Sequence, residues 1–381
     1  MKKLYWRPPH VSRTALSLVA IVAVGMLVLV ESYPVVRKQD HYGARIAAAR
    51  LSRDCMEAIK AEKLRLGHKP DPEVDPAETG IIGESLTAVT SNTGFLSAKL
   101  TSANPNFAAV LVHLLIEAGV SQGDVVAMGA SGSFPGLNVS TYAAIKTLGL
   151  KPIIIASTSS SEWGANHVDY LWLDMDRTLR DKQLIDFGAM AATHGGIDDL
   201  GVGMTKQKRA LLDVAMDRNG VRKLEPTSLA DSINKRMGLY DEIASNRPIK
   251  AYINVGGGSA SVGTHVGKKQ FKPGLNSEPP RSKTVPDSVM LRFAKRDVPV
   301  IHISRVKLLA ERYGLPYEPR VAVPIGQGSV FVGSEYNRWL AFGGLVAIMA
   351  VMFAFLRWDI GMRVLRGMRP RDTDASPEHM V

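Results

Sequence analysis

The stretch GDVVAMGASGSFPGLN, residues 123–138, predicts a buried strand that runs through a glycine- and serine-rich loop into a helix. Within it, DVVAM at 124–128 lacks the polar alternation of a half-exposed strand, so both of its faces are expected to be covered. A helix is expected at 138–148, a buried helix at 107–118, and PIIIA at 152–156 predicts the next strand. This alternation predicts an α/β fold with a mainly parallel sheet and helices on both faces, a Rossmann-like arrangement.

The same pattern continues toward the C-terminus and sets the expected domain limits. AYINV at 251–255 and VPVIHI at 298–303 predict two further buried strands, and the Lys-, Pro- and Ser-rich residues 268–286 predict a flexible loop. Before the domain, residues 40–66 predict a helix and the Pro-rich acidic residues 68–80 a linker. The expected organisation is a cytoplasmic N-terminus (1–13), a transmembrane helix (14–30), a juxtamembrane helix and linker (31–80), an extracytoplasmic α/β domain (81–338), a second transmembrane helix (339–356) and a basic cytoplasmic tail (357–381).

Two apolar runs near the chain ends predict the membrane-spanning helices. Residues 14–30 are 17 uncharged residues and residues 339–356 are 18, near the lower end of the roughly 17 to 25 that cross a hydrocarbon core. Five arginines follow the second run within residues 357–371, which places the C-terminus in the cytoplasm. Two crossings then place both termini in the cytoplasm and the central domain outside the cytoplasmic (inner) membrane. A cleaved signal peptide is the alternative for the first run, although no small-x-small cleavage site follows it.

Composition narrows the function classes. The chain has 381 residues, of which 22% are charged and 45% hydrophobic, as in globular proteins. The net charge of +11 lies largely beside the apolar runs and in one loop, so nucleic acid is not an expected partner and the membrane is. Cys55 is the only cysteine, which excludes an intrachain disulfide and a CxxC metal or redox site. Walker A and GxGxxG motifs are absent, and no cofactor or metal is expected.

Three loops rich in serine or glycine follow three predicted strands: GASGS at 129–133, STSSS at 157–161 and GGGSASVG at 256–263. In an open parallel sheet, ligands bind beyond the carboxyl ends of the strands, so the three loops are expected to share one cleft. Backbone N–H groups and hydroxyls at a helix N-terminus favour an anion, although each glycine alternatively serves only its own turn. The candidate ligand-binding residues are Ser131, Gly132, Ser133, Asn138 (also the expected helix N-cap), Ser157, Thr158, Ser159, Gly256, Gly257, Gly258 and Ser259, with Lys99 as countercharge.

Catalytic and metal-binding alternatives rest on weaker patterns. GASGS is close to the GxSxG elbow of serine hydrolases, but its fifth residue is Ser133, so Ser131 is only a weak catalytic candidate. HGGIDDLG at 194–201 offers a histidine and two carboxylates to a metal, or is an ordinary polar loop. The partners available to Ser131 are Asp174 and Asp176, otherwise expected as surface acids on one face of a strand end, and the histidines His194, His265 and His302.

Residues 123–160 resemble the phosphosugar-binding unit of sugar-isomerase domains. The matching features are Ser131, Gly132 and the following LGLKPIIIAST, whereas Gly129 and Phe134 stand where that family has hydroxyl residues. The resemblance implies a sugar-isomerase-like fold and, as one alternative, a phosphosugar ligand.

Most of the chain resembles the poly-gamma-glutamate system protein family. The residues that carry the resemblance are SLTAVTSNTGFLSAKLTSANPNFAA at 85–109, GDVVAMGASGSFPGLN and INVGGGSASVG, set between the two apolar runs. It implies a membrane-anchored accessory component of poly-gamma-glutamate biosynthesis or export that binds the anionic polymer. Its expected partners are the poly-gamma-glutamate ligase and the membrane and surface components of that system. No catalytic residue comes with the resemblance, and an extracytoplasmic amide hydrolase or transferase acting on the polymer is the alternative.

Overall fold

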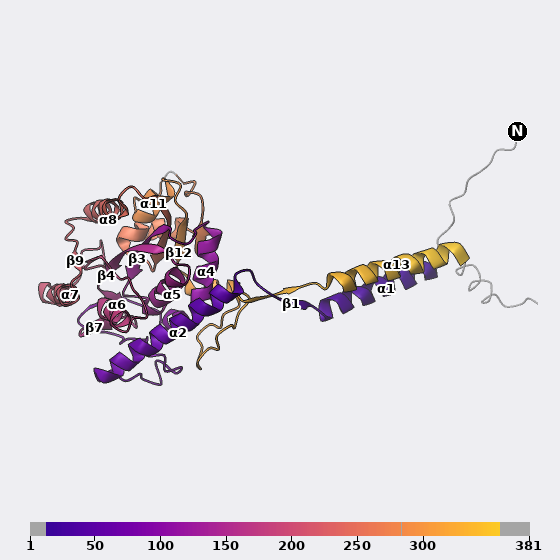
Figure 1. Cartoon of the computed structure of the whole chain (residues 1–381), viewed down its shortest axis with the longest axis horizontal. Coiled ribbons are helices and arrows are strands. Elements are labelled where there is room, and N and C mark those ends of the chain that lie inside the picture. The colour runs from indigo at the N-terminus through magenta and orange to yellow at the C-terminus, as the bar shows by residue number, and fades with distance from the viewer. Residues whose placement is uncertain (1–12, 283, 359–381) are drawn as a thin grey trace, which may run out of the picture. The chain divides into compact units, whose positions relative to one another are not determined.

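The computed structural model describes residues 13–282 and 284–358 (Figure 1). The chain divides into two compact units, one of residues 38–332 and one formed by both ends of the chain. Nearly all of the expected cytoplasmic N-terminus and of the expected tail lies outside the described residues.

A seven-stranded sheet forms the centre of the 38–332 unit, in the order β11-β12-β10-β3-β4-β8-β9. Its six other strands run parallel, and β11 pairs antiparallel with β12. The unit is therefore a mixed α/β fold with a mostly parallel sheet, as the sequence predicts. The strands are β3 (Val125–Ser131), β4 (Lys151–Ser157), β8 (Ala191–Thr193), β9 (Arg222–Lys223), β10 (Ile249–Val255), β11 (Gly274–Asn276) and β12 (Val300–Ile303).

Alternate side chains of the sheet enter two separate cores. Val126 and Met128 of β3 belong to one buried cluster, whereas Val125 and Ala127 belong to the other. This is the period-2 pattern of a strand that is covered on both faces. Helices α2 (Tyr42–Arg65), α4 (Phe107–Glu117), α5 (Pro135–Thr147) and α6 (Trp172–Asp181) cover the first face, and α8 (Leu229–Ala244) and α11 (Val289–Ala294) cover the second (Figure 1).

Shorter elements complete the unit. A two-stranded parallel pair joins β2 to β5, and a hairpin joins β6 to β7. The remaining elements are β2 (Thr90–Asn92), β5 (Ser160–Ser161), β6 (Asn166–His167), β7 (Tyr170–Leu171), α3 (Leu96–Ser102), α7 (Lys206–Arg218), α9 (Ser259–Val262), α10 (His265–Gln270) and α12 (Val306–Arg312).

Three expected boundaries differ from the structure. The globular unit begins at Lys38 and not at residue 81, because α2 buries Ala48, Cys55 and Ile59 completely in the first core. Helix α5 begins at Pro135, a residue favoured in the first helical turn, so Asn138 lies inside the helix and is not its N-cap. The expected flexible loop at 268–286 contains the end of α10 and all of β11.

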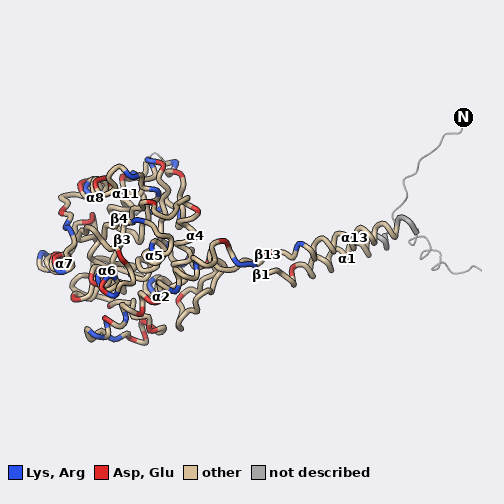
Figure 2. Tube along the Cα trace, viewed as in Figure 1, with Lys and Arg blue, Asp and Glu red and all other residues tan. Residues whose placement is uncertain are grey.

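The unit formed by the chain ends contains α1 (Arg13–Ser32) and α13 (Arg338–Trp358), and the strands β1 (Val35–Lys38) and β13 (Val332–Glu335) pair with each other. Among the described residues, one helix is long and apolar enough to cross a membrane, at Arg338–Phe355 with a mean hydropathy of 1.9. Leu16–Ser32 of α1 is a shorter apolar helix. Figure 2 shows that both helices are almost free of charged residues.

Candidate functional site

The strand order places a ligand-binding position at the carboxyl end of β3. From β3 the chain moves through β4 and β8 to β9 on one side, and then returns to add β10 and β12 on the other side of β3. The loops that leave β3 and β10 therefore diverge, which opens a crevice at this topological switch point. A cavity of about 420 Å³ lies there, lined by residues of the loops after β3, β4, β8 and β10.

The structure brings most of the candidate ligand-binding residues to this cavity, which we call the switch-point cavity. The three loops predicted from the sequence all reach it, although they are far apart along the chain. The candidates that line it are Lys99, Ser131, Ser133, Ser157, Ser159, Gly257, Gly258 and Ser259.

Four candidates lie behind the lining and shape it. A Cβ on Gly132 would lie 2.8 Å from the carbonyl oxygen of Ser159, so only glycine lets the first two loops approach this closely. Asn138 donates its side-chain N–H to the Ser131 carbonyl at 2.8 Å. Thr158 is fully buried, and Gly256 has a φ of +89°, a conformation that glycine adopts without strain.

The backbone N–H groups of the first loop are already bonded within the protein. Gly132 donates to the Ser157 carbonyl, Ser133 to Ser131 Oγ and Phe134 to the Ser131 carbonyl, each at 3.2 Å. The expectation that these groups face an anion is therefore wrong for this loop. Recognition of a ligand depends on the side chains of the cavity.

Lys99 is the most unusual of these side chains. It projects from α3, is 2% exposed, donates to the Ser133 carbonyl and lies 2.8 Å from Ser161 Oγ. Its Nζ also lies 4.0 Å from the centroid of the Phe134 ring. Burial alone lowers the pKa of Lys99 from 10.5 to about 7, and no described carboxylate offsets this effect.

Several lining residues escaped prediction. Ser91 and Thr93 come from the segment around β2, Ser161 ends the STSSS loop, and Thr264 and Lys268 lie at or within α10. The segment at 85–109 contains Ser91, Thr93 and Lys99 together, but only the tertiary pairing of β2 with β5 shows that it covers the cavity. Lys268 was not predicted as a site residue because it lies in residues 268–286, which were expected to be a flexible loop.

A buried ion pair between Asp199 and Arg236 contacts the carboxyl ends of β4 and β8, from which two of the cavity loops begin. Asp199 and Arg236 are each 2% exposed and lie 2.9 Å apart. Thr193 Oγ1 donates to Asp199 at 2.8 Å, and Arg236 Nη2 lies 3.3 Å from Ser157 Oγ. Asp199 therefore fixes the ends of β8 and β4 and has a structural partner, which argues against a metal-binding role for HGGIDDLG.

Two of the histidines considered for a hydrolase at Ser131 have other partners. His194 pairs with Asp213 at 2.8 Å, and neither lines the cavity. His302 bonds to Asn254 at 3.0 Å, and burial lowers its pKa to about 4. His265 opens α10.

The two acids suggested as partners of Ser131 form ion pairs with arginines instead. They lie in α6, where Asp174 pairs with Arg218 and Asp176 with Arg180. Asp176 is completely buried, and burial raises its pKa to about 6, so the expectation of a surface acid is wrong for Asp176.

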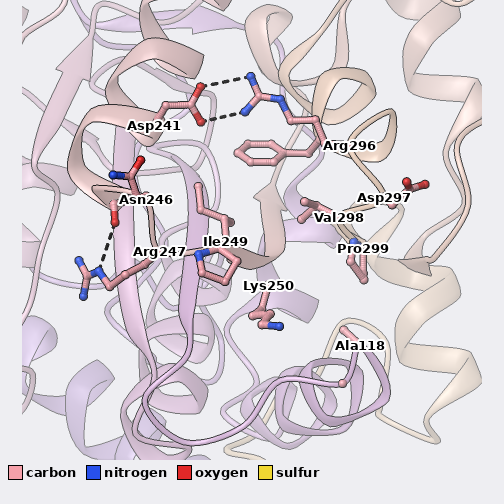
Figure 3. A pocket seen from close by; sticks show the side chains of 14 residues that line it. Ala118, Asp241, Asn246, Arg247, Ile249, Lys250, Arg296, Asp297, Val298 and Pro299 are labelled. Carbon is pink, nitrogen blue, oxygen red and sulfur yellow. Dashed lines mark hydrogen bonds and ion pairs between the residues drawn. The ribbon is translucent and has the colours of Figure 1, made fainter.

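A larger hollow of about 690 Å³ lies at the opposite edge of the sheet (Figure 3). It is lined by residues at the amino ends of β10 and β12, including Ile249, Lys250 and Pro299. Asp241 and Arg296 pair across it at 2.8 Å, and each is about half exposed. None of the candidate residues lies in this hollow, whereas eight of them line the switch-point cavity, so the switch-point cavity is the better candidate site.

The chain is a mixed α/β protein with a candidate ligand site, the switch-point cavity, at the switch point of its sheet. No protein-family model, curated protein or solved structure matches the chain.

Proposed function

We propose that this protein is a membrane-anchored accessory component of poly-gamma-glutamate biosynthesis or export, whose switch-point cavity binds carboxylates of the polymer. The observation that supports this most strongly is the composition of the cavity wall. Among the described residues that line the cavity, none is acidic, two are lysines and nine carry hydroxyls. The hydroxyl residues are Ser91, Thr93, Ser131, Ser133, Ser157, Ser159, Ser161, Ser259 and Thr264.

This composition suits a ligand that carries negative charge and many hydrogen-bond acceptors. A carboxylate accepts only, so serine and threonine hydroxyls and lysine ammonium groups are complementary to it. The cavity volume of about 420 Å³ lies within the range of small-ligand sites. Phe95, which is 80% exposed and also lines the cavity, offers an apolar surface for the methylene groups of a glutamyl chain.

The membrane attachment in this proposal uses both α1 and α13 as spanning helices. The proposal is supported by the apolar composition of both helices and by their close contact, since a Cβ on Gly344 would lie 2.9 Å from Met26 Cε. Small residues permit such close approach of helices in membranes. Both termini are then cytoplasmic and the α/β unit is extracytoplasmic at the inner membrane. The paired helices offer the contact surface for the ligase and other membrane components.

Binding is tested by calorimetry with the full-length protein in detergent micelles and poly-gamma-glutamate of defined length. Lys268→Ala removes an ammonium group from the cavity, whereas Lys269→Ala removes one from the next position of the same helix, outside the cavity. We expect at least a tenfold loss of affinity for Lys268→Ala and little change for Lys269→Ala. Equal effects of the two substitutions, or binding of a sugar phosphate in place of the polymer, would refute the proposed ligand.

Topology is tested separately by cysteine labelling in intact cells. Cys55 is buried, so it is replaced by serine, and single cysteines are introduced at Gln207, an exposed residue of α7, or at Ser376 in the C-terminal tail. We expect a membrane-impermeant maleimide to label residue 207 directly and residue 376 only after permeabilisation. Labelling of both positions in intact cells contradicts the two-span arrangement.

A further inference from the structure

We propose that Ser161 and Lys99 form a nucleophile and base pair that cleaves an amide bond of the ligand in the switch-point cavity. The inference goes beyond polymer binding but rests on the proposed function for the identity of the amide. Its geometric basis is the 2.8 Å distance between Lys99 Nζ and Ser161 Oγ, both of which belong to residues that line the cavity.

The two side chains are held in place by separate elements. Ser161 is 9% exposed and lies in β5, which pairs with β2, and its backbone N–H donates to Ser133 Oγ at 3.0 Å. Lys99 comes from α3, and its contact with the Ser133 carbonyl fixes the position of the ammonium group. The pair is therefore oriented before any ligand arrives, as general base catalysis requires.

Lys99 differs from the other buried lysine that the structure describes in detail. Lys63 is 4% exposed, donates to the Ile82 carbonyl at 2.7 Å and faces Asp75 and Glu84, which favour its charged form. Lys99 has no such acid, and burial alone lowers its pKa to about 7. A neutral amine is thus accessible near neutral pH, and it can accept the Ser161 proton while it donates to the Ser133 carbonyl.

The reaction balances without an added cofactor. Lys99 takes the hydroxyl proton as Ser161 Oγ bonds to the amide carbonyl carbon, and hydroxyls that line the cavity stabilise the oxyanion. The C–N bond then breaks, and Lys99 returns the proton to the departing amine. Water adds to the resulting serine ester as Lys99 takes a proton from it. Cleavage of the ester C–O bond returns this proton to Ser161 and releases a carboxylic acid.

Ser131 is a weaker nucleophile in this structure. Its hydroxyl oxygen accepts the Ser133 N–H at 3.2 Å, and among the described residues no base contacts it. The same cavity thus contains a matched control serine, which differs from Ser161 in lacking the lysine.

The test uses the full-length protein in detergent and a fluorophosphonate, which forms a stable bond to an activated serine and releases fluoride. We expect mass spectrometry to find the adduct on Ser161, no adduct in Ser161→Ala, and at least a hundredfold slower reaction in Lys99→Met. Lys269→Ala should react as the unmodified protein does. An adduct on Ser131, or an unchanged rate in Lys99→Met, would overturn the assignment.

A second variant guards against misfolding of Lys99→Met. Ser161→Cys in the Cys55→Ser background should react with iodoacetamide at a rate that rises as pH increases through about 7, the pKa of Lys99. A rate that follows an ordinary thiol pKa near 8.5 would contradict the pairing. Calorimetry with Ser161→Ala separates the two proposals. Polymer binding with no serine adduct refutes the dyad alone, whereas an adduct with no polymer binding refutes the proposed polymer.

Discussion

Replacing Lys99 by methionine should change how folding stability depends on pH. The pKa of Lys99 is lowered from 10.5 to about 7 in the folded chain, so between these values the unfolded chain binds a proton that the folded chain does not. Stability must therefore rise with pH over this window. The cost of burying Lys99 is about 4 kcal/mol at pH 7 and about 2 kcal/mol at pH 9, a gain of about 2 kcal/mol. Lys99→Met has no such group and should lose this gain.

The assay is urea unfolding of the full-length protein in detergent micelles at pH 7, 8 and 9, followed by tryptophan fluorescence. Two other buried groups contribute pH dependence to both variants. The pKa of Lys63 is lowered to about 8, which adds stability in the same direction, and the pKa of the Cys55 thiol is raised to about 12, which removes stability above pH 9. The informative quantity is thus the difference between the variants at each pH. A constant difference would refute the assigned pKa of Lys99 and remove its role as a base.

Three further predictions concern the support of the site and the paired helices. Asp199→Asn leaves the Arg236 charge buried without its partner, so we expect a loss of about 3 to 5 kcal/mol in the free energy of unfolding. The measurement is a urea titration, and an unchanged value would contradict the buried ion pair. Gly132→Ala places a Cβ 2.8 Å from the Ser159 carbonyl oxygen and should lower the melting temperature. Gly238→Ala in α8 meets no atom within 4 Å and should raise the free energy of unfolding by about 0.5 to 1 kcal/mol. The same shift for both variants would be inconsistent with the close approach of the loops. In the Cys55→Ser background, cysteines at residues 26 and 344 should form a disulfide on mild oxidation, because Met26 Cβ lies 3.3 Å from the Cβ position of residue 344. Cysteines at residues 26 and 343 should not form one. Equal cross-linking of both pairs on a gel would exclude this helix contact.

The sequence predicted four of the seven strands of the sheet (β3, β4, β10 and β12) and the convergence of three loops, because both depend on local pattern and on one general rule. Uninterrupted apolar runs such as those of β3 and β4 mark strands that are buried on both faces, and the carboxyl ends of parallel strands face one edge. Ser131, Ser157 and Ser259 could therefore be placed together before their neighbours were known.

The features that the sequence analysis predicted wrongly or missed depend on tertiary contacts. The linker composition after residue 66 suggested a domain boundary, yet the apolar stripe of α2 packs into the main core. Whether the N–H groups of Gly132 and Ser133 are free depends on their partners across the loops, which no local pattern reveals. The contact of Lys99 with Ser161 joins residues 62 positions apart, so it could not be read from spacing.

The chain enters and leaves its globular unit at one point, where Gln39 donates to the Phe331 carbonyl at 2.9 Å. The α/β unit is therefore an insertion between two apolar helices. Because folding of the unit brings its two ends together, the helices can pair without a further loop-closure entropy cost. A short turn that replaced residues 39–331 would leave the two helices connected as a hairpin. Either part can change in sequence without altering the connection, so a different globular unit could be placed on the same pair of helices.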